Sequence, residues 1–417
     1  MPESPGTVCY LSADRIRLME QPQNQDIDQP SANASGAPSR DSTGALDIQA
    51  FGRKHQVAIA LFLILSLALS LRLYGINWDQ GGLFHPDERA ILFKVNDLSF
   101  PSVGEIPDLL DKDKSTLNPK WFSYGSLPLY ILRTIVSLAS PFADWDIFDL
   151  RYVGRSIAAF ADTATIAMIF LLARTWLSRR TALLASLLAA LSVISIQLSH
   201  FFTVDVFLAL FGTSAIYFML RYAHYGHLRH AVLAGAFVGL ALATKASALV
   251  LLAPLGFTFL LFAVSQTGDQ FALVKDRVDL WRRVQWAAVA FAASVVALIG
   301  VLVITQPYMF LDWSTYQESV TKESEMVRRI VDFPFTRQYI DTPKYIYQFW
   351  QLGTYGLGPA LGMFGWAALA VGAIYTLRTR RKFDLIIWAY LVPYLLVTGG
   401  FEVKFLRYML PVVPFMV

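Results

Sequence analysis

The sequence predicts an all-α polytopic integral membrane protein. Of its 417 residues, 55% are hydrophobic and only 16% are charged, whereas soluble domains usually carry about 25% charged residues. The runs 286–305 and 355–377 contain no charged residue, and each is long enough to cross a hydrocarbon core of about 30 Å. Lysine and arginine cluster beside apolar runs rather than on one polar face, so the net charge of +4 gives no reason to expect a nucleic-acid partner.

The N-terminal segment differs in composition from the rest of the chain. Residues 1–50 are rich in Ser, Pro, Gln, Asn and Asp and have no apolar periodicity, which is typical of a disordered segment. We therefore expect a disordered cytoplasmic tail at 1–50 and a membrane domain at 51–417. Cys9 is the single cysteine, so no disulfide can form within one chain.

Ten apolar stretches follow the tail as candidate membrane spans. Their approximate bounds are 56–74, 152–176, 181–198, 204–222, 230–247, 248–265, 285–305, 355–377, 383–399 and 408 onward. The continuous run 231–264 would reach about 51 Å as one helix, at about 1.5 Å per residue, so we divide it near the polar pair Thr244 and Lys245. The last stretch has only about ten residues after Tyr408, half of what a crossing needs. We therefore expect a longer gene product, and we expect residues 1–417 alone to be unstable or inactive.

The positive residues predict the orientation of these spans. They cluster at 53–54, 174–180, 221–229, 277–283 and 378–382. With ten spans every cluster falls on one side, which the positive-inside rule assigns to the cytoplasm. The loops 75–151 and 306–354 then lie on the extracytoplasmic side of the cell membrane. Within the first loop, 126–140 is apolar but too short to span, so we expect a helix lying in the interface.

This topology gathers ionisable residues at the extracytoplasmic face. They are Asp87, Glu88, Lys120, Asp205, Lys245, Glu402, Lys404 and Arg407. A carboxylate in such a place can take a proton from a hydroxyl, and neighbouring cations can hold a phosphate. Plainer interpretations stay open, because a lysine or arginine at a membrane surface can simply snorkel and Asp205 can cap a helix.

Two further groups of polar residues have weaker signals. His85 and His200 lack the matched spacing of a metal site, so we predict no metal ligands and no cofactor, although a divalent metal requirement stays open. Asp162 lies inside the second predicted span, where we expect it to bond a neighbouring helix.

The order of these motifs resembles the GT-C class of membrane glycosyltransferases, above all protein O-mannosyltransferases and the aminoarabinose transferase of lipid A. Those enzymes carry an acidic pair in a large first external loop, similar to Asp87 and Glu88, and an aspartate at the start of a later span, similar to Asp205. The run 239–245 is similar to their "GL…TK" run, and 407–414 to "RY-x-LP-x-x-P". The ordered set carries the resemblance, over about 56–417, rather than any one motif.

The resemblance implies an inverting sugar transfer at the extracytoplasmic face. The donor would be a polyprenyl-phosphate sugar in the bilayer, and the acceptor a hydroxyl of a protein, lipid or glycan. Asp87 would be the general base, with Glu88 and Asp205 orienting the acceptor or Asp87. The donor phosphate would be bound by Lys120, Lys245, Lys404 and Arg407. The families' arginine before span two would be Arg151 or Arg155.

A secondary transporter is the alternative from another functional class. It would use the same carboxylates as proton or ion sites. Transporters usually place coupling charges near the bilayer midplane and show internal repeats, and we find no repeat of this kind in the sequence. A single cavity lined by Asp87, Asp205 and Lys245 would favour the transferase, whereas a continuous path through the bundle would favour transport.

Overall fold

Helices make up nearly all of the described secondary structure. The structure is a computed structural model that describes residues 48–140 and 145–417, so 1–47 of the predicted tail lie outside the described residues. Within the described ranges, β-structure is limited to two isolated bridges, Ser265 to Leu273 and Gln270 to Arg381. The predicted all-α fold is confirmed.

Seven helical segments are long and apolar enough to cross a membrane in the described part of the chain. They lie in α1 (Ile48–Leu73), α4 (Ile147–Ala173), α7 (Val204–Tyr225), the run Ala246–Val264, α10 (Arg277–Thr305), α14 (Pro359–Thr379) and α15 (Lys382–Gly399). An eighth candidate consists of α5 (Arg179–Ala190) and α6 (Val193–Ser199), which are bent by 55° at the break between them. The chain is therefore polytopic, as predicted.

Besides the bent pair α5 and α6, two more of the ten predicted spans differ from a full-length α-helix. Helix α8 (Leu228–Leu242) has 15 residues, about 22 Å at 1.5 Å per residue, which is less than the hydrocarbon thickness. The tenth stretch forms a 3₁₀-helix, η5 (Leu406–Phe415), with Pro411 and Pro414 inside it. Proline lacks the N–H that an α-helix needs and clashes with the preceding turn. The described residues thus contain seven or eight candidate spans by length and composition rather than the ten predicted.

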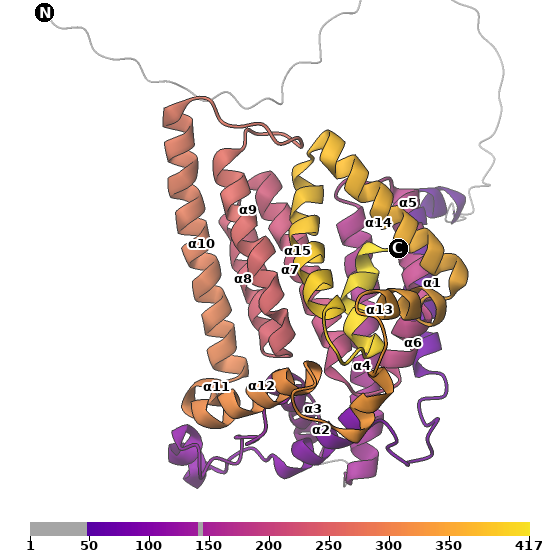
Figure 1. Cartoon of the computed structure of the whole chain (residues 1–417), viewed down its shortest axis with the longest axis vertical. Helices are drawn as coiled ribbons and strands as arrows, with labels where there is room; N and C mark the ends of the chain where they lie inside the picture. The colour runs from indigo at the N-terminus through magenta and orange to yellow at the C-terminus, as the bar shows by residue number, and fades with distance from the viewer. Residues whose placement is uncertain (1–47, 141–144) are drawn as a thin grey trace, which may run out of the picture. The chain divides into compact units, whose positions relative to one another are not determined.

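Two glycines bring α8 close to α10. A Cβ on Gly235 would lie 2.0 Å from the carbonyl oxygen of Ser294, and one on Gly239 would lie 2.7 Å from that of Leu298. Small residues four apart on one helix face allow this backbone approach in membranes. Helix α8 thus packs between the longer helices α7 and α10 (Figure 1).

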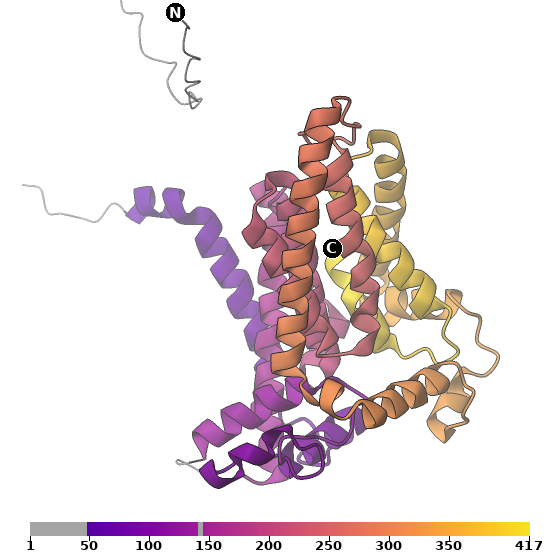
Figure 2. The ribbon, with the colours of Figure 1, turned by 90° about the vertical axis from the view of Figure 1, so that its left-hand side faces the viewer.

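The two long loops lie together at one end of the bundle. They carry α2 (Pro86–Asp97), α3 (Ser126–Ala139), α11 (Tyr308–Leu311) and α12 (Trp313–Val327), all at the lower end in Figure 1 and again in Figure 2. Between the loops, Asn118 Nδ2 donates to Asp312 Oδ2 at 3.1 Å. This arrangement agrees with the predicted placement of both loops on one side.

The opposite end of the bundle holds shorter, cation-rich connections. The segment after α9 (Leu252–Val264) pairs with the turn between α14 and α15, where Phe271 N donates to Arg380 O at 2.9 Å. Lys382 N donates to Asp269 O, also at 2.9 Å. These connections contain several of the positive clusters that the sequence assigns to the cytoplasmic side.

The first loop is bonded to a break in the bundle. Helix α8 ends at Leu242 and the 3₁₀-helix η2 (Ala246–Leu251) follows, so the predicted division near Thr244 is confirmed. Gly125 N donates to Thr244 O at 2.9 Å, just before α3 begins. A Cβ at Gly125 would lie 1.9 Å from the carbonyl oxygen of Ala243. The loop therefore fixes the backbone that carries Lys245.

Candidate functional site

The acidic pair lies in the first turn of α2. Pro86 occupies the first helical position, and Nδ1 of the N-cap residue His85 accepts a hydrogen bond from Glu88 N at 3.4 Å. Proline suits this position, and carboxylates suit the positive end of the helix dipole. Consecutive residues of an α-helix point about 100° apart, so Asp87 and Glu88 face different surroundings.

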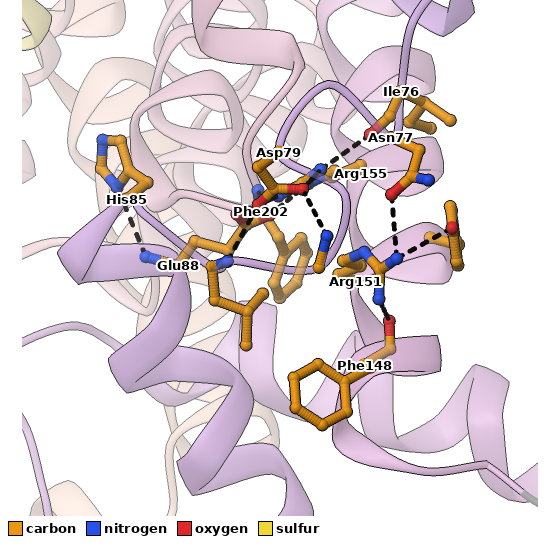
Figure 3. Close-up of polar contacts among 12 residues, drawn as sticks. Ile76, Asn77, Asp79, His85, Glu88, Phe148, Arg151, Arg155 and Phe202 are labelled. Atoms are coloured by element: carbon orange, nitrogen blue, oxygen red, sulfur yellow. Dashed lines mark hydrogen bonds and ion pairs between the residues drawn. The ribbon is translucent and has the colours of Figure 1, made fainter.

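Glu88 points into a buried cluster with Arg155 and Asp79 (Figure 3). Arg155, on α4, donates from Nε to Glu88 Oε1 at 2.8 Å and from Nη2 to Oε2 at 2.7 Å. The same guanidinium donates to Asp79, with Nη1–Oδ1 at 3.0 Å and Nη2–Oδ2 at 2.7 Å. All three side chains are completely buried. Glu88 therefore ties α2 to α4.

Backbone donors complete this cluster. Phe202 N donates to Glu88 Oε1 at 2.9 Å, and Leu83 N donates to Asp79 Oδ2 at 3.0 Å. A buried charge is costly unless it is paired and hydrogen-bonded, and here two carboxylates share one guanidinium and these N–H groups. Nearby, Arg151 Nη2 donates to Asn77 Oδ1 at 2.9 Å (Figure 3). Arg151 and Arg155, the two candidates for the families' arginine, thus hold the first loop in place.

Asp87 faces the other way, into a chain of ion pairs. Its Oδ2 lies 2.9 Å from Arg407 Nη2, and Arg407 Nε lies 3.7 Å from Asp205 Oδ2. Lys245 Nζ donates to Asp205 Oδ1 at 2.8 Å. We call these four residues the charge ladder. They come from α2, the break after α8, the first turn of α7 and η5, so the structure brings together four of the seven predicted site residues.

The charge ladder is neutral overall and largely shielded from solvent. The Asp205 side chain is 2% exposed, and the other three are 14–16% exposed. Aromatic rings cover the cations: Lys245 Nζ lies 4.6 Å from the Tyr408 ring centroid, and Arg407 Cζ lies 4.0 Å from that of Phe405. Arg407 Nε is buried without a hydrogen-bond partner among the described residues, so it can still donate to an incoming anion.

Two predicted phosphate-binding lysines lie elsewhere. Lys120 is exposed, and its Nζ donates to the carbonyl oxygen of Asp113 at 3.0 Å. Lys404 is buried, and its Nζ donates to the carbonyl oxygen of Glu402 at 2.9 Å. Burial lowers the pKa of Lys404, although the Glu402 charge opposes this shift. In the described part of the chain, neither lysine forms an ion pair or hydrogen bond with the charge ladder.

A cavity of about 210 Å³ opens beside the charge ladder. It is lined by Lys245 together with Tyr124 from the first loop, Glu323 from α12, Tyr394 from α15 and Tyr408 from η5. Most of its surface is apolar, with a few polar groups among aromatic rings, which is the usual composition of a small-molecule site.

The cavity departs from the predicted lining. Of the three residues expected to share it, Lys245 lines it, whereas Asp87 and Asp205 are not among its lining residues. Glu323 was missed because α12 is a polar helix that resembles a solvated surface segment. A signal was present: Val320, Glu323 and Val327 recur at helical spacing and line the cavity together.

The histidines of this end have structural partners. His200 shares hydrogen bonds with the carbonyl oxygens of Ile196, at 2.7 Å from Nδ1, and of Tyr74, at 2.8 Å from Nε2. Within residues 48–140 and 145–417, no group of three or more His, Cys, Asp or Glu side chains could hold a metal ion.

A separate buried ion pair joins α1 to α4. Arg72 Nε donates to Asp162 Oδ2 at 2.6 Å, and both side chains are at most 3% exposed. Arg72 Nη1 also donates to the carbonyl oxygens of Ala68 and Ala190. The expectation that Asp162 bonds a neighbouring helix is confirmed.

One protein family matches part of this chain. The family of dolichyl-phosphate-mannose-protein mannosyltransferases matches residues 149–299, a region that contains Arg155, Asp205 and Lys245 but neither Asp87 nor Arg407. No curated protein sequence matches the chain.

The fold is similar to solved membrane proteins. The oligosaccharyltransferase AglB from Archaeoglobus fulgidus, in complex with an inhibitory peptide and a dolichol-phosphate, has a TM-score of 0.54 and 16% identity, with 88% of this chain and 50% of AglB covered. ArnT from Cupriavidus metallidurans, bound to undecaprenyl phosphate, has a TM-score of 0.53 and 16% identity, with 88% and 58% covered. The chain thus spans about half the length of these proteins. The GT-C-type helical fold is confirmed.

Proposed function

We propose that this protein transfers a sugar from a polyprenyl-phosphate donor to an acceptor hydroxyl at the extracytoplasmic membrane face. The charge ladder is the observation that carries the proposal, because it combines a carboxylate for proton removal with cations for a phosphate. The family match and the fold support it, since the family description names a lipid-linked sugar and the solved AglB and ArnT structures contain polyprenyl phosphates.

Asp87 is the general base in this proposal. It removes the proton of the acceptor hydroxyl while the acceptor oxygen forms a bond to the anomeric carbon of the donor. The bond from that carbon to the phosphate oxygen breaks on the opposite face, so the configuration inverts and polyprenyl phosphate leaves. Lys245 and Arg407 stabilise the negative charge on the leaving phosphate.

The remaining site residues position these groups. Asp205 holds both cations of the charge ladder, and Glu88 fixes the first turn of α2 through Arg155. A donor phosphate bound at the free Nε of Arg407 would compete with Asp87 for the charge of the guanidinium and weaken that ion pair. The base would then become free when the donor is bound.

A protein hydroxyl is the acceptor that the comparisons favour. The matched family transfers mannose to proteins by its description, and AglB was solved with an inhibitory peptide. The positive clusters at the end of the bundle opposite the charge ladder favour an extracytoplasmic site in the cell membrane.

The test is transfer by the purified full-length protein in liposomes. The donor is mannosyl dolichyl phosphate labelled in the sugar, and the acceptor is a peptide rich in serine and threonine. We expect label to appear on the peptide and dolichyl phosphate to be released in equal amounts. Identification of the lipid-linked sugar that accumulates in cells lacking the protein would define the natural donor. If no lipid-linked sugar accumulates and the protein instead moves ions across the liposome membrane, the transporter alternative is correct.

A further inference from the structure

The cavity beside the charge ladder contains one acidic side chain, Glu323. It lies on α12, which belongs to the second long loop, and it is half-buried among residues of other elements. Neighbouring charged residues on the same helix differ from it: Glu318 is exposed and does not line the cavity. Glu323 is thus the acid that the second loop contributes to the cavity.

The carboxyl of Glu323 has no cation of its own. None of the ion pairs among the described residues involves it, whereas Asp87 and Asp205 are each paired. Burial raises the pKa of the Glu323 carboxyl; a hydrogen bond with Ser123 and the charge of Lys245 oppose the rise. A carboxyl that can carry its proton both donates and accepts hydrogen bonds, and a sugar hydroxyl needs both.

The other lining groups suit a sugar joined to a phosphate. Lys245 lines the same cavity and also belongs to the charge ladder, so a phosphate held there would place the attached sugar in the cavity. Tyr124, Tyr394 and Tyr408 supply aromatic surfaces and hydroxyl groups around it. Apolar walls with few polar groups fix the orientation of a bound ligand.

We infer that the cavity of Lys245, Tyr124, Tyr394, Tyr408 and Glu323 holds the sugar of the lipid-linked donor, and that Glu323 hydrogen-bonds one of its hydroxyls. Glu323 is then a specificity-determining residue, because a sugar that lacks this hydroxyl or presents it differently loses the bond. The inference rests on the proposed function, and it adds the subsite and the residue that distinguish one donor sugar from another.

Two lipids, one with the sugar and one without it, separate this role from others when the effect of each variant is compared with wild type on the same lipid. Binding of dolichyl phosphate and of mannosyl dolichyl phosphate is measured for the full-length protein in lipid nanodiscs. For Glu323→Ala we expect about a tenfold loss of affinity for the mannosyl lipid, the effect of one lost hydrogen bond. Affinity for dolichyl phosphate should stay within about twofold of wild type, because the phosphate contacts are unchanged.

Matched variants complete the design. Glu323→Gln should retain most of the affinity, since an amide also donates and accepts. Glu318→Ala, on the exposed face of the same helix, should leave both affinities unchanged. Lys245→Ala should lower the affinity for dolichyl phosphate and for mannosyl dolichyl phosphate. Repeating the measurement with glucosyl dolichyl phosphate should show that Glu323→Ala changes the preference between the two sugars.

Several results would overturn the inference. An equal loss of affinity for dolichyl phosphate and mannosyl dolichyl phosphate in Glu323→Ala would indicate a structural role. Unchanged affinity for the mannosyl and glucosyl lipids would show that Glu323 does not contact the sugar. If wild-type protein binds none of these lipids, the proposed function itself fails, which is a different result from wild-type binding with an ineffective Glu323→Ala.

Discussion

Oδ2 of Asp87 lies 2.9 Å from Nη2 of Arg407, although these residues belong to opposite ends of the described chain. The contact joins the first long loop to η5, the 3₁₀-helix that follows α15. A proposed proton acceptor and a proposed phosphate ligand are therefore in direct contact. In the proposed reaction Asp87 acts on the acceptor and Arg407 on the donor phosphate, so the two roles meet at this contact.

Replacing Asp87 with asparagine should nearly abolish transfer. Loss of a general base typically lowers a rate by about 10²–10⁴-fold, whereas the amide keeps the shape of the side chain and the fold. Sugar transfer and donor binding are measured on the same purified protein, and we expect only transfer to fail. A near wild-type rate in Asp87→Asn together with an inactive Asp205→Asn would show that the base is assigned wrongly.

Replacing Arg155 with alanine should unfold the first loop rather than alter chemistry selectively. Two buried carboxylates, Glu88 and Asp79, would lose their cation, and breaking a buried pair by removing one partner costs about 3–5 kcal/mol. Thermal unfolding in detergent measures the loss. Arg89→Ala, at an exposed position of α2, is the control and should leave the midpoint unchanged. Equal midpoints for both variants would contradict the structural role of Arg155.

Glycine at position 235 should be required for the packing of α8. Alanine there would place a Cβ 2.0 Å from the carbonyl oxygen of Ser294, and overpacking of this kind typically costs about 1–3 kcal/mol. Gly300→Ala, also helical, has no heavy atom within 4 Å of the added carbon and should be neutral or slightly stabilising. The two variants are compared by unfolding midpoint, and an unaffected Gly235→Ala protein would mean that α8 and α10 lie farther apart.

Acid should weaken the N-cap of α2 through His85. Burial lowers the pKa of His85, although the Asp87 charge opposes this shift. In the folded protein the ring therefore stays neutral to a lower pH than the ordinary pKa of about 6.5 would allow. The unfolded chain then binds more protons than the folded one as pH falls through about 6.5, and stability must decrease in that direction. We expect His85→Asn, which caps without titrating, to show a smaller decrease in unfolding midpoint between about pH 7 and pH 5.5. Parallel curves for the two proteins would exclude His85 as the cause.

The first long loop should be accessible from outside the cell. Ser102 is exposed within it, so Ser102→Cys in a Cys9→Ser background should react with a membrane-impermeant thiol reagent on intact cells. The prediction follows from the one-sided positive clusters. Labelling only after cell lysis would show that the orientation is the opposite one, with the charge ladder on the cytoplasmic side.

The sequence was a good guide to residues whose charge conflicts with an apolar neighbourhood. Asp87, Asp205, Lys245 and Arg407 stand out for this reason, and they form the charge ladder. The division of 231–264 was also predictable, because one helix of that length cannot fit a bilayer. Both predictions rest on the cost of placing polar groups or surplus helix length in the hydrocarbon core, which can be read from the sequence alone.

The direction of a side chain and long-range partners were harder to predict. Glu88 was assigned to the same site as Asp87, but the turn of α2 directs it to Arg155 instead. Asp79 follows no recognisable motif, and its burial depends on a loop bonded to α4. Glu323 depends on α12 packing over a cavity built by other segments. Local pattern gives at most a helix face, as for Val320, Glu323 and Val327, and not the tertiary contacts which that face makes.

The ion pair of Arg72 and Asp162 bears on how the helices enter the membrane during synthesis. Arg72 lies in the last turn of α1, where a long side chain can reach the headgroups while it has no partner. Asp162 lies inside α4, and an unpaired carboxylate at a helix centre costs about 2.5–3.5 kcal/mol on insertion. Because α1 is synthesised before α4, we expect Arg72 to be in the membrane when α4 inserts. Arg72 can then pair with Asp162 and lower the cost of keeping α4 in the bilayer.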